Sequence, residues 1–181
     1  ITNLTPSYNK LIISFDINKI NFKELQKIVE KINIDEIQNE AFRKIEIPVC
    51  CEEKFSLDIK RLESQFLIDR DKIFEIFFEK EYFCYMTGFI AGMPFLGDID
   101  NKIRMKRLET PRVKVPKGSI GITEKFANVY TFESPGGWNI IGNTPLMIFD
   151  NKKISKPNLI NPGDTVVFKK ISIEDYKAYN E

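Results

Sequence analysis

The stretch Gly88-Phe-Ile-Ala-Gly-Met-Pro-Phe-Leu-Gly97 sets the character of the second half of the chain. It places three glycines and one proline in a run that is otherwise apolar. Similar breakers recur as far as Pro162-Gly163, and helical periodicity is absent beyond Tyr82. All nine glycines lie in this half. Short β-type runs separated by glycine and proline are typical of a compact all-β barrel or sandwich.

The first half has a different pattern, in which strands alternate with helices. The runs 10–16 and 44–50 are rich in β-branched residues, as strands are. Asn21 is followed three residues later by Glu24, and apolar residues then recur at helical spacing as far as Ile32. This combination predicts an amphipathic helix that begins with a capping box.

Residues that commonly begin helices predict where the remaining helices start. One is expected after Ser56, another from Asp69, and a short closing helix over residues 172–179. The prediction is therefore an α+β protein, with a small N-terminal α/β layer domain over residues 1–81 and a β-rich domain over residues 82–181. Since the chain begins with Ile1, we expect the opening element of the first domain to be missing.

Composition excludes several classes of function. The 181 residues include no histidine, so this chain alone cannot form a Ser-His-Asp triad, a Cys-His pair or a His-ligated metal site. Lysine and arginine total 27 against 26 acidic residues, and this balance argues against nucleic acid as a partner. No apolar run approaches the ~18 residues that span a bilayer. We therefore expect a cytoplasmic protein that binds neither nucleic acid nor membrane, with no metal site assigned.

The three cysteines do not form a disulfide framework or a metal-binding pair. Cys50 and Cys51 are adjacent, and Cys84 is distant in sequence. Free cysteine usually behaves as a small apolar residue. We expect reduced, partly buried thiols.

The stretch 88–97 is the first of three candidate functional segments. Its glycines allow tight turns, and Phe89 and Phe95 could line a cleft, with Asp98 and Asp100 close behind. The alternative is a glycine-rich barrel corner with buried phenylalanines.

The second candidate segment, residues 110–119, carries cations. Arg112 and Lys114 alternate along a predicted strand, and Lys117 follows. Such side chains bind carboxylate or phosphate groups, although a solvated strand face explains the same pattern.

The third segment, Ser134-Pro-Gly-Gly-Trp138, combines two glycines with the only tryptophan. Consecutive glycines expose backbone amides, which can bind an anion or an oxyanion. A plain turn anchored by a buried tryptophan is the alternative. Together the three segments would offer an indole wall, exposed amides and cations, as a small anionic ligand requires.

The order of these motifs resembles the allophanate hydrolase subunit 1 family, also called the KipI or PxpB family, which includes the B-type subunits of 5-oxoprolinase. This family is related to the carboxyltransferase part of urea carboxylase. The resemblance covers nearly the whole chain, and it is carried by Gly88-Phe89, Phe95-Leu-Gly97, Thr110-Pro-Arg112, Val115-Pro-Lys-Gly-Ser-Ile-Gly-Ile122, Ser134-Pro-Gly-Gly-Trp138, Ile141-Gly-Asn-Thr-Pro-Leu146 and Pro162-Gly-Asp164. Asn143 departs from the arginine usual in the family at that position.

The resemblance implies a cyclophilin-like β-barrel after the N-terminal domain, whose first strand and helix would be missing here. It implies a non-autonomous subunit of an ATP-dependent 5-oxoprolinase, which opens the lactam of 5-oxoproline to glutamate. The implied partners are the subunit 2 (KipA or PxpC) type protein and a third subunit. Two alternatives remain: a KipI-like regulator that inhibits a sensor histidine kinase, and a component of an allophanate or urea amidolyase.

Residue roles follow from motif position within this resemblance. Arg112 would hold the substrate carboxylate, and Asp98 or Asp100 would position water or a magnesium ion that accompanies ATP. The backbone amides of Gly136 and Gly137 would hold an oxyanion. The other residues of the predicted substrate site are Phe89, Phe95, Ser134, Trp138 and Asn143.

Overall fold

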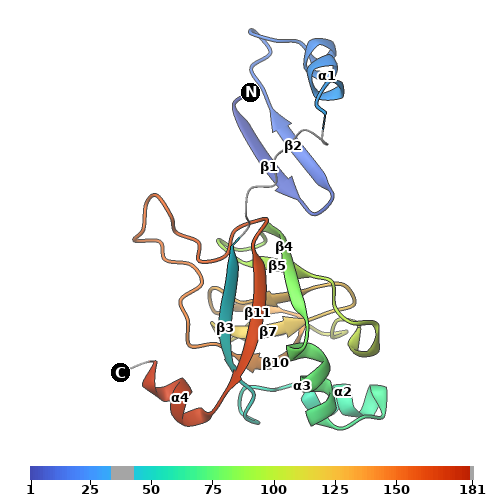
Figure 1. Ribbon diagram of the computed structural model, residues 1–181, viewed down its shortest axis with the longest axis vertical. Coiled ribbons are helices and arrows are strands. Elements are labelled where there is room, and N and C mark those ends of the chain that lie inside the picture. The colour runs from blue at the N-terminus through green and yellow to red at the C-terminus, as the bar shows by residue number, and fades with distance from the viewer. Residues whose placement is uncertain (34–42, 180–181) are drawn as a thin grey trace. The chain divides into compact units, whose positions relative to one another are not determined.

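The computed structural model describes residues 1–33 and 43–179, which belong to two compact units. The first unit is Ile1–Phe42 and the second is Arg43–Glu181. Figure 1 shows the helices and strands of each unit.

The first unit contains a hairpin and one helix. Strands β1 (Asn3–Ser7) and β2 (Lys10–Ser14) pair antiparallel, and helix α1 spans Phe22–Glu30. The predicted capping box is confirmed: Asn21 Oδ1 accepts from the Glu24 amide at 3.0 Å, and Glu24 Oε2 accepts from the Asn21 amide at 3.0 Å. These two bonds satisfy amide groups that the helix itself leaves unpaired.

The second unit is built on a closed β-barrel, so the predicted α+β class with a barrel is confirmed. Its strands follow one another around the barrel in the order β10 (Asn139–Asn143), β3 (Lys44–Cys50), β11 (Thr165–Ile171), β4 (Glu81–Thr87), β5 (Pro94–Gly97), β8 (Ala127–Val129) and β7 (Ser119–Ile122). Strands β3 and β11 pair in parallel, and the other neighbours pair antiparallel. Closure gives each of these strands a neighbour on both sides.

The boundary between the units lies earlier than the predicted boundary after residue 81. Strand β3 belongs to the barrel, where it pairs with β11 from Lys44 to Cys50. Helices α2 (Ile59–Phe66) and α3 (Arg70–Phe78) pack against each other and against barrel strands. Local pattern identifies all three elements correctly, but it does not reveal that β3 pairs with a strand near the end of the chain.

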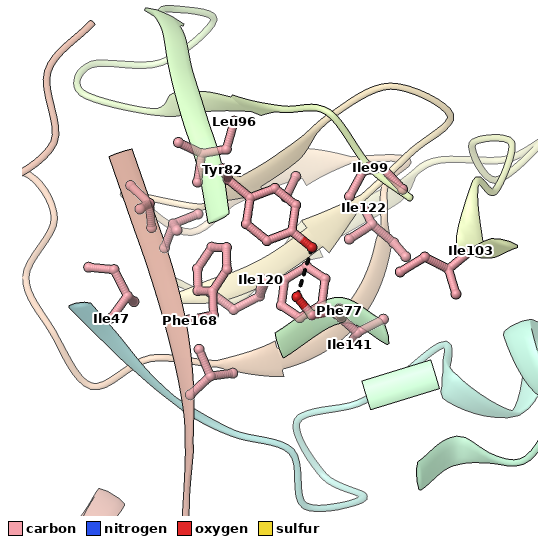
Figure 2. Close-up of a cluster of buried hydrophobic side chains, with 14 of the residues drawn as sticks. Ile47, Phe77, Tyr82, Leu96, Ile99, Ile103, Ile120, Ile122, Ile141 and Phe168 are labelled. Carbon is pink, nitrogen blue, oxygen red and sulfur yellow. Dashed lines mark hydrogen bonds between the residues drawn. The ribbon is translucent and has the colours of Figure 1, made fainter. Parts of the chain in front are cut away.

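The core of the second unit lies inside the barrel. Phe77, from α3, closes one end of it, with its ring stacked on Phe168 at a centroid distance of 5.0 Å and 5.2 Å from Tyr82. The Tyr82 hydroxyl donates to the Phe77 carbonyl at 2.9 Å, as Figure 2 shows. All three side chains are essentially inaccessible to solvent. The bond gives a buried hydroxyl a partner, which removes the cost of burying it.

A second, smaller cluster of buried side chains includes Val115, Tyr130, Trp138 and Ile140. Successive side chains of a strand point to opposite faces. Ile141 and Val129 belong to the barrel core, whereas their neighbours Ile140 and Tyr130 belong to the second cluster. The second cluster therefore packs on the outer face of the barrel wall. A separate two-stranded sheet, β6 (Arg112–Val115) with β9 (Ser134–Gly136), contributes Val115 to it.

Two short helices complete the second unit: η2 (Asn101–Ile103) and α4 (Ile173–Ala178), which fulfils the prediction of a closing helix. The Ser172 side chain caps α4 by accepting from the Asp175 amide at 3.0 Å. Of the helices described, none is both long enough and apolar enough to cross a bilayer.

The three cysteines are free and buried. Desolvation raises the pKa of the Cys51 and Cys84 thiols to about 12. Thiolate, the reactive form, is therefore almost absent from these two side chains at neutral pH.

We expect the native protein to resist a thiol-specific reagent at neutral pH, because all three thiols are buried and the raised pKa of Cys51 and Cys84 suppresses their thiolate. A colorimetric thiol titration should detect almost no reactive sulfur in the native chain and three thiols per chain in denaturant. Rapid reaction of Cys51 or Cys84 without denaturant would contradict this prediction.

Candidate functional site

A small cavity lies at the second cluster of buried side chains, and we call it the aromatic cavity. Its volume is about 110 Å³. Its lining consists of Phe89, Met93, Phe95, Arg107, Tyr130, Gly136, Gly137 and Trp138. Aromatic rings with a few polar groups at the edge are the usual lining of a small-molecule site.

Trp138 and Phe95 form the aromatic wall. Their rings meet nearly edge to face, with centroids 5.7 Å apart and an interplanar angle of 77°. Trp138 is only 6% exposed, so its indole is fixed by packing. Phe89 is 75% exposed and has a φ of 69°, and it lies at the rim. The cavity therefore has a rigid wall and an exposed aromatic side chain at its edge.

Gly136 makes room for the Tyr130 hydroxyl in the wall. A Cβ atom at position 136 would lie 2.1 Å from Tyr130 Oη, a distance that no side chain tolerates. At Gly137 a Cβ would have no neighbour closer than 3.6 Å. Desolvation raises the pKa of Tyr130, so its phenol stays protonated at neutral pH and remains a hydrogen-bond donor.

Arg107 supplies the positive charge of the cavity. Its guanidinium lies over the Trp138 ring, 5.6 Å from the centroid, in a cation–π arrangement. The Leu108 amide donates to the Gly137 carbonyl at 2.8 Å, which holds the segment that carries Arg107 beside the cavity. Sequence analysis missed this residue because it lies outside any helix or strand and in none of the candidate segments. Only its position in space identifies it.

The structure brings together half of the predicted site residues. Phe89, Phe95, Gly136, Gly137 and Trp138 all line the aromatic cavity. The remaining predicted residues are not among its lining; these are Asp98, Asp100, Arg112, Ser134 and Asn143.

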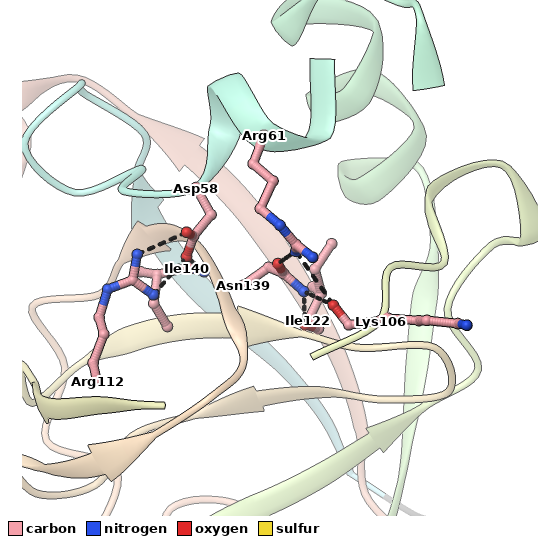
Figure 3. A network of polar contacts seen from close by, with 7 residues as sticks. All are labelled: Asp58, Arg61, Lys106, Arg112, Ile122, Asn139 and Ile140. Atoms are coloured by element: carbon pink, nitrogen blue, oxygen red, sulfur yellow. Dashed lines mark hydrogen bonds and ion pairs between the residues drawn. The ribbon is translucent and has the colours of Figure 1, made fainter. Parts of the chain in front are cut away.

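Arg112 is paired inside the protein. Its Nη1 and Nη2 atoms donate to Asp58 Oδ2 and Oδ1 at 3.0 and 2.7 Å, a two-point ion pair (Figure 3). The Asp58 side chain is 5% exposed, and its Oδ2 also accepts from the Ile140 amide at 2.6 Å. This carboxylate ties β6 to β10 and to the start of α2. The Arg112 guanidinium already has a carboxylate partner, whereas Arg107 forms no ion pair with any residue that the structure describes.

Asn143 and Ser134 lie in structural positions. Asn143 donates from Nδ2 to the Lys117 carbonyl at 2.9 Å and accepts from the Tyr176 hydroxyl at 2.7 Å, which fastens α4 to the barrel. Ser134 is on β9 opposite Val115, and its buried hydroxyl has no hydrogen-bond partner among the described residues.

The two aspartates are not gathered into a metal site. Asp98 is exposed and accepts from the Tyr85 hydroxyl at 3.5 Å, whereas Asp100 caps η2 by accepting from the Lys102 amide at 2.9 Å. Across residues 1–33 and 43–179, no three acidic or cysteine side chains lie close enough together to bind a metal ion. Their predicted role with water or magnesium stays a prediction.

Comparison with known proteins gives consistent matches. The family model described as carboxyltransferase domain, subdomain C and D, matches residues 1–160. The chain is 33% identical to the B-type subunit of 5-oxoprolinase from Bacillus subtilis, over 97% of this chain and 78% of that protein. The crystal structure of a conserved protein from Pyrococcus horikoshii is 36% identical, with a TM-score of 0.71, over 97% of this chain and 81% of that one. The urea amidolyase of Saccharomyces cerevisiae is 23% identical over the whole chain, which spans 11% of that protein.

The pairing of Arg112 predicts a structural role that can be measured. Arg112→Ala should lower the free energy of unfolding by about 3 kcal/mol, because it leaves the buried Asp58 carboxylate without its cation. Lys114→Ala, on the same strand, is the matched control. It breaks an ion pair with Glu133 between two exposed side chains and should cost less than about 1 kcal/mol. If urea denaturation gave the same loss of unfolding free energy for both variants, the structural role of Arg112 would be contradicted.

Proposed function

The chain belongs to the carboxyltransferase domain, subdomain C and D, family, and we propose that it is the B-type subunit of an ATP-dependent 5-oxoprolinase. In this reaction the lactam ring of 5-oxoproline is opened to glutamate. The observation that carries the proposal is the aromatic cavity, where a rigid Trp138 wall lies beneath the Arg107 guanidinium. The 33% identity to the corresponding 5-oxoprolinase subunit of Bacillus subtilis supports it.

The cavity suits a small ring that carries one carboxylate. A volume of about 110 Å³ is near that of a substituted five-membered ring. Its flat face would pack on Trp138, and its carboxylate would pair with Arg107 through charge-assisted hydrogen bonds. The protonated Tyr130 hydroxyl is a donor suited to the lactam oxygen, where negative charge develops when the carbonyl carbon is attacked. Backbone amides at Gly136 and Gly137 would assist it.

ATP belongs to the proposed complex but not to this cavity. When bound, ATP supplies a phosphoryl group that activates the lactam amide, whose resonance otherwise opposes ring opening. The aromatic cavity has no space for a nucleotide beside the ring. We therefore assign the substrate, and not ATP, to the aromatic cavity, and its own residues would bind and orient the ring.

The proposed partners are a subunit 2 (KipA or PxpC) type protein and a third subunit. A cavity with one cation, one phenol and no described carboxylate in its lining has no evident base, so the companion subunits would complete the catalytic set. Free, buried thiols are suited to a reducing compartment, and we propose the cytoplasm as the location of the complex.

A component of a urea-processing enzyme is the second candidate. The similarity to yeast urea amidolyase over the whole length of this chain favours it. Urea is neutral and lacks a carboxylate, so it would make no use of the Arg107 cation, whereas allophanate carries a carboxylate that would pair with it.

Arg107→Ala should weaken 5-oxoproline binding by about 10- to 100-fold, as expected for loss of a charge-assisted hydrogen bond. The measurement is 5-oxoproline-dependent ATP hydrolysis by the assembled complex, with KM separated from kcat. Lys114→Ala, which removes an exposed cation outside the cavity, is the control. A complex that assembles but shows no turnover with 5-oxoproline would contradict the proposal, and turnover with urea alone would favour the second candidate.

Trp138 offers a direct test of where the ligand binds. It is the only tryptophan of the chain and forms the cavity wall, so 5-oxoproline should change its fluorescence in a saturable way. The Arg107→Ala variant should need a correspondingly higher concentration to reach the same change. In a complex whose other subunits contain tryptophan, tryptophan-free versions of them isolate the signal. Turnover without any change in Trp138 emission would remove the substrate from this cavity.

A further inference from the structure

A second, larger cleft opens beside helices α2 and η2, and we call it the cationic cleft. Its volume is about 680 Å³. The charged side chains in its lining are Arg61 of α2, Arg104 and Lys106 after η2, and Glu124 and Lys125 from the turn between β7 and β8. Four cations therefore face one carboxylate, on a chain whose overall formal charge is only +1.

Arg61 is held in a fixed position by neutral groups. Its Nη1 atom donates to the side-chain oxygen of Asn139 and to the Lys106 carbonyl (Figure 3). Asn139 is fully buried, and its amide nitrogen donates to the carbonyls of Lys106 and Ile122, at 3.1 Å each. The network fixes the guanidinium without neutralising it.

Arg112 and Arg61 differ in the charge of their hydrogen-bond partners. Both arginines contact residues at the joint between α2 and β10. Arg112 meets the Asp58 carboxylate, whereas the described partners of Arg61 are amide and carbonyl oxygens. A neutral acceptor orients a cation and leaves its charge available to a ligand. The charge of Arg61 is therefore uncompensated.

The other cations of the cleft likewise form no ion pair among the described residues, although Glu124 lies in the same lining. Arg104 donates from Nε to the Ile99 carbonyl at 3.1 Å, again a neutral acceptor. Within the part of the chain that the structure describes, no carboxylate forms an ion pair with Arg61, Arg104, Lys106 or Lys125. Clustered like charges repel one another, so their convergence on one cleft favours an anion there.

We propose that the cationic cleft binds a small polyanion that carries a chain of phosphate groups. Guanidinium groups match the geometry of phosphate oxygens at two points, and the two arginines are already oriented. Lys106 and Lys125 are exposed, and their flexible side chains can close on further oxygens. The cleft has about 680 Å³ against about 110 Å³ in the aromatic cavity, so it admits a much larger ligand. This inference rests on the cleft alone and does not require that the chain act on 5-oxoproline.

Calorimetric titration of the full chain with inorganic triphosphate at low ionic strength tests the proposal. Lys106→Glu and Lys125→Glu should each weaken binding by about tenfold or more, since each replaces an attraction with a repulsion. Lys156→Glu makes the same change in net charge at an exposed position outside the cleft, and it should change affinity by less than about twofold. All three side chains are exposed, so folding is preserved.

Two further titrations settle the class of ligand. Titration with ATP tests whether the cleft accepts a nucleotide as well as an inorganic phosphate chain. ATP should bind at least as tightly as triphosphate, and Lys106→Glu and Lys125→Glu should weaken its binding too. Citrate has fewer negative charges than triphosphate and holds them on three separate carboxylates instead of along a phosphate chain, so it should bind more weakly. Absence of triphosphate binding, equal binding of citrate, or an equal effect of Lys156→Glu would overturn the proposal. Titration with 5-oxoproline, followed by Trp138 fluorescence, reports on the aromatic cavity alone. Its result tests the proposed function and does not depend on whether the cationic cleft binds phosphate.

Discussion

The parallel pairing of β3 with β11 holds the barrel of the second unit closed. It joins Lys44–Cys50 to Thr165–Ile171 along the whole length of both strands, as Figure 1 shows. Without it the barrel would be an open sheet whose edges carry unpaired amides and carbonyls. Closure also creates the enclosed core in which Phe77, Tyr82 and Phe168 pack. Because these strands come from opposite ends of the unit, their pairing brings the intervening segments onto one scaffold.

The joint between α2 and β10 depends on which charged side chains are paired there. Asp58 is almost fully buried and accepts from both Arg112 and the Ile140 amide. A buried carboxylate requires such partners, because desolvation otherwise disfavours its charge. Arg61 lies one helical turn further along α2, and its hydrogen-bond partners within residues 1–33 and 43–179 are neutral acceptors. The same joint thus contains one arginine that stabilises the fold and one whose charge is directed to the cationic cleft.

The aromatic cavity and the cationic cleft have different shapes and linings, and the two proposals assign a different ligand to each. The first has aromatic walls, one cation and space for a small ring, whereas the second is wide, polar and positively charged. Their linings meet at neighbouring residues of one segment, since Lys106 faces the cleft and Arg107 lies over Trp138.

Residue patterns predicted helices α1 to α4, strands β2 and β3 and a second half rich in short strands, and the resemblance to a known family added the barrel. Strand β1 and the bounds of the barrel strands after β3 came only from the structure. The Asn21–Glu24 capping box follows from residues that are close together in the chain, so local pattern was sufficient. Ser134–Gly136, expected to be part of a glycine loop, is instead strand β9 paired with β6. The folded chain was needed to show that β3 belongs to the barrel, that Arg107 rather than Arg112 lies at the aromatic cavity, and that Asn143 fastens α4. The difference comes from separation along the chain. Asp58 and Arg112 are 54 residues apart, and no periodicity specifies which cation will meet a buried carboxylate.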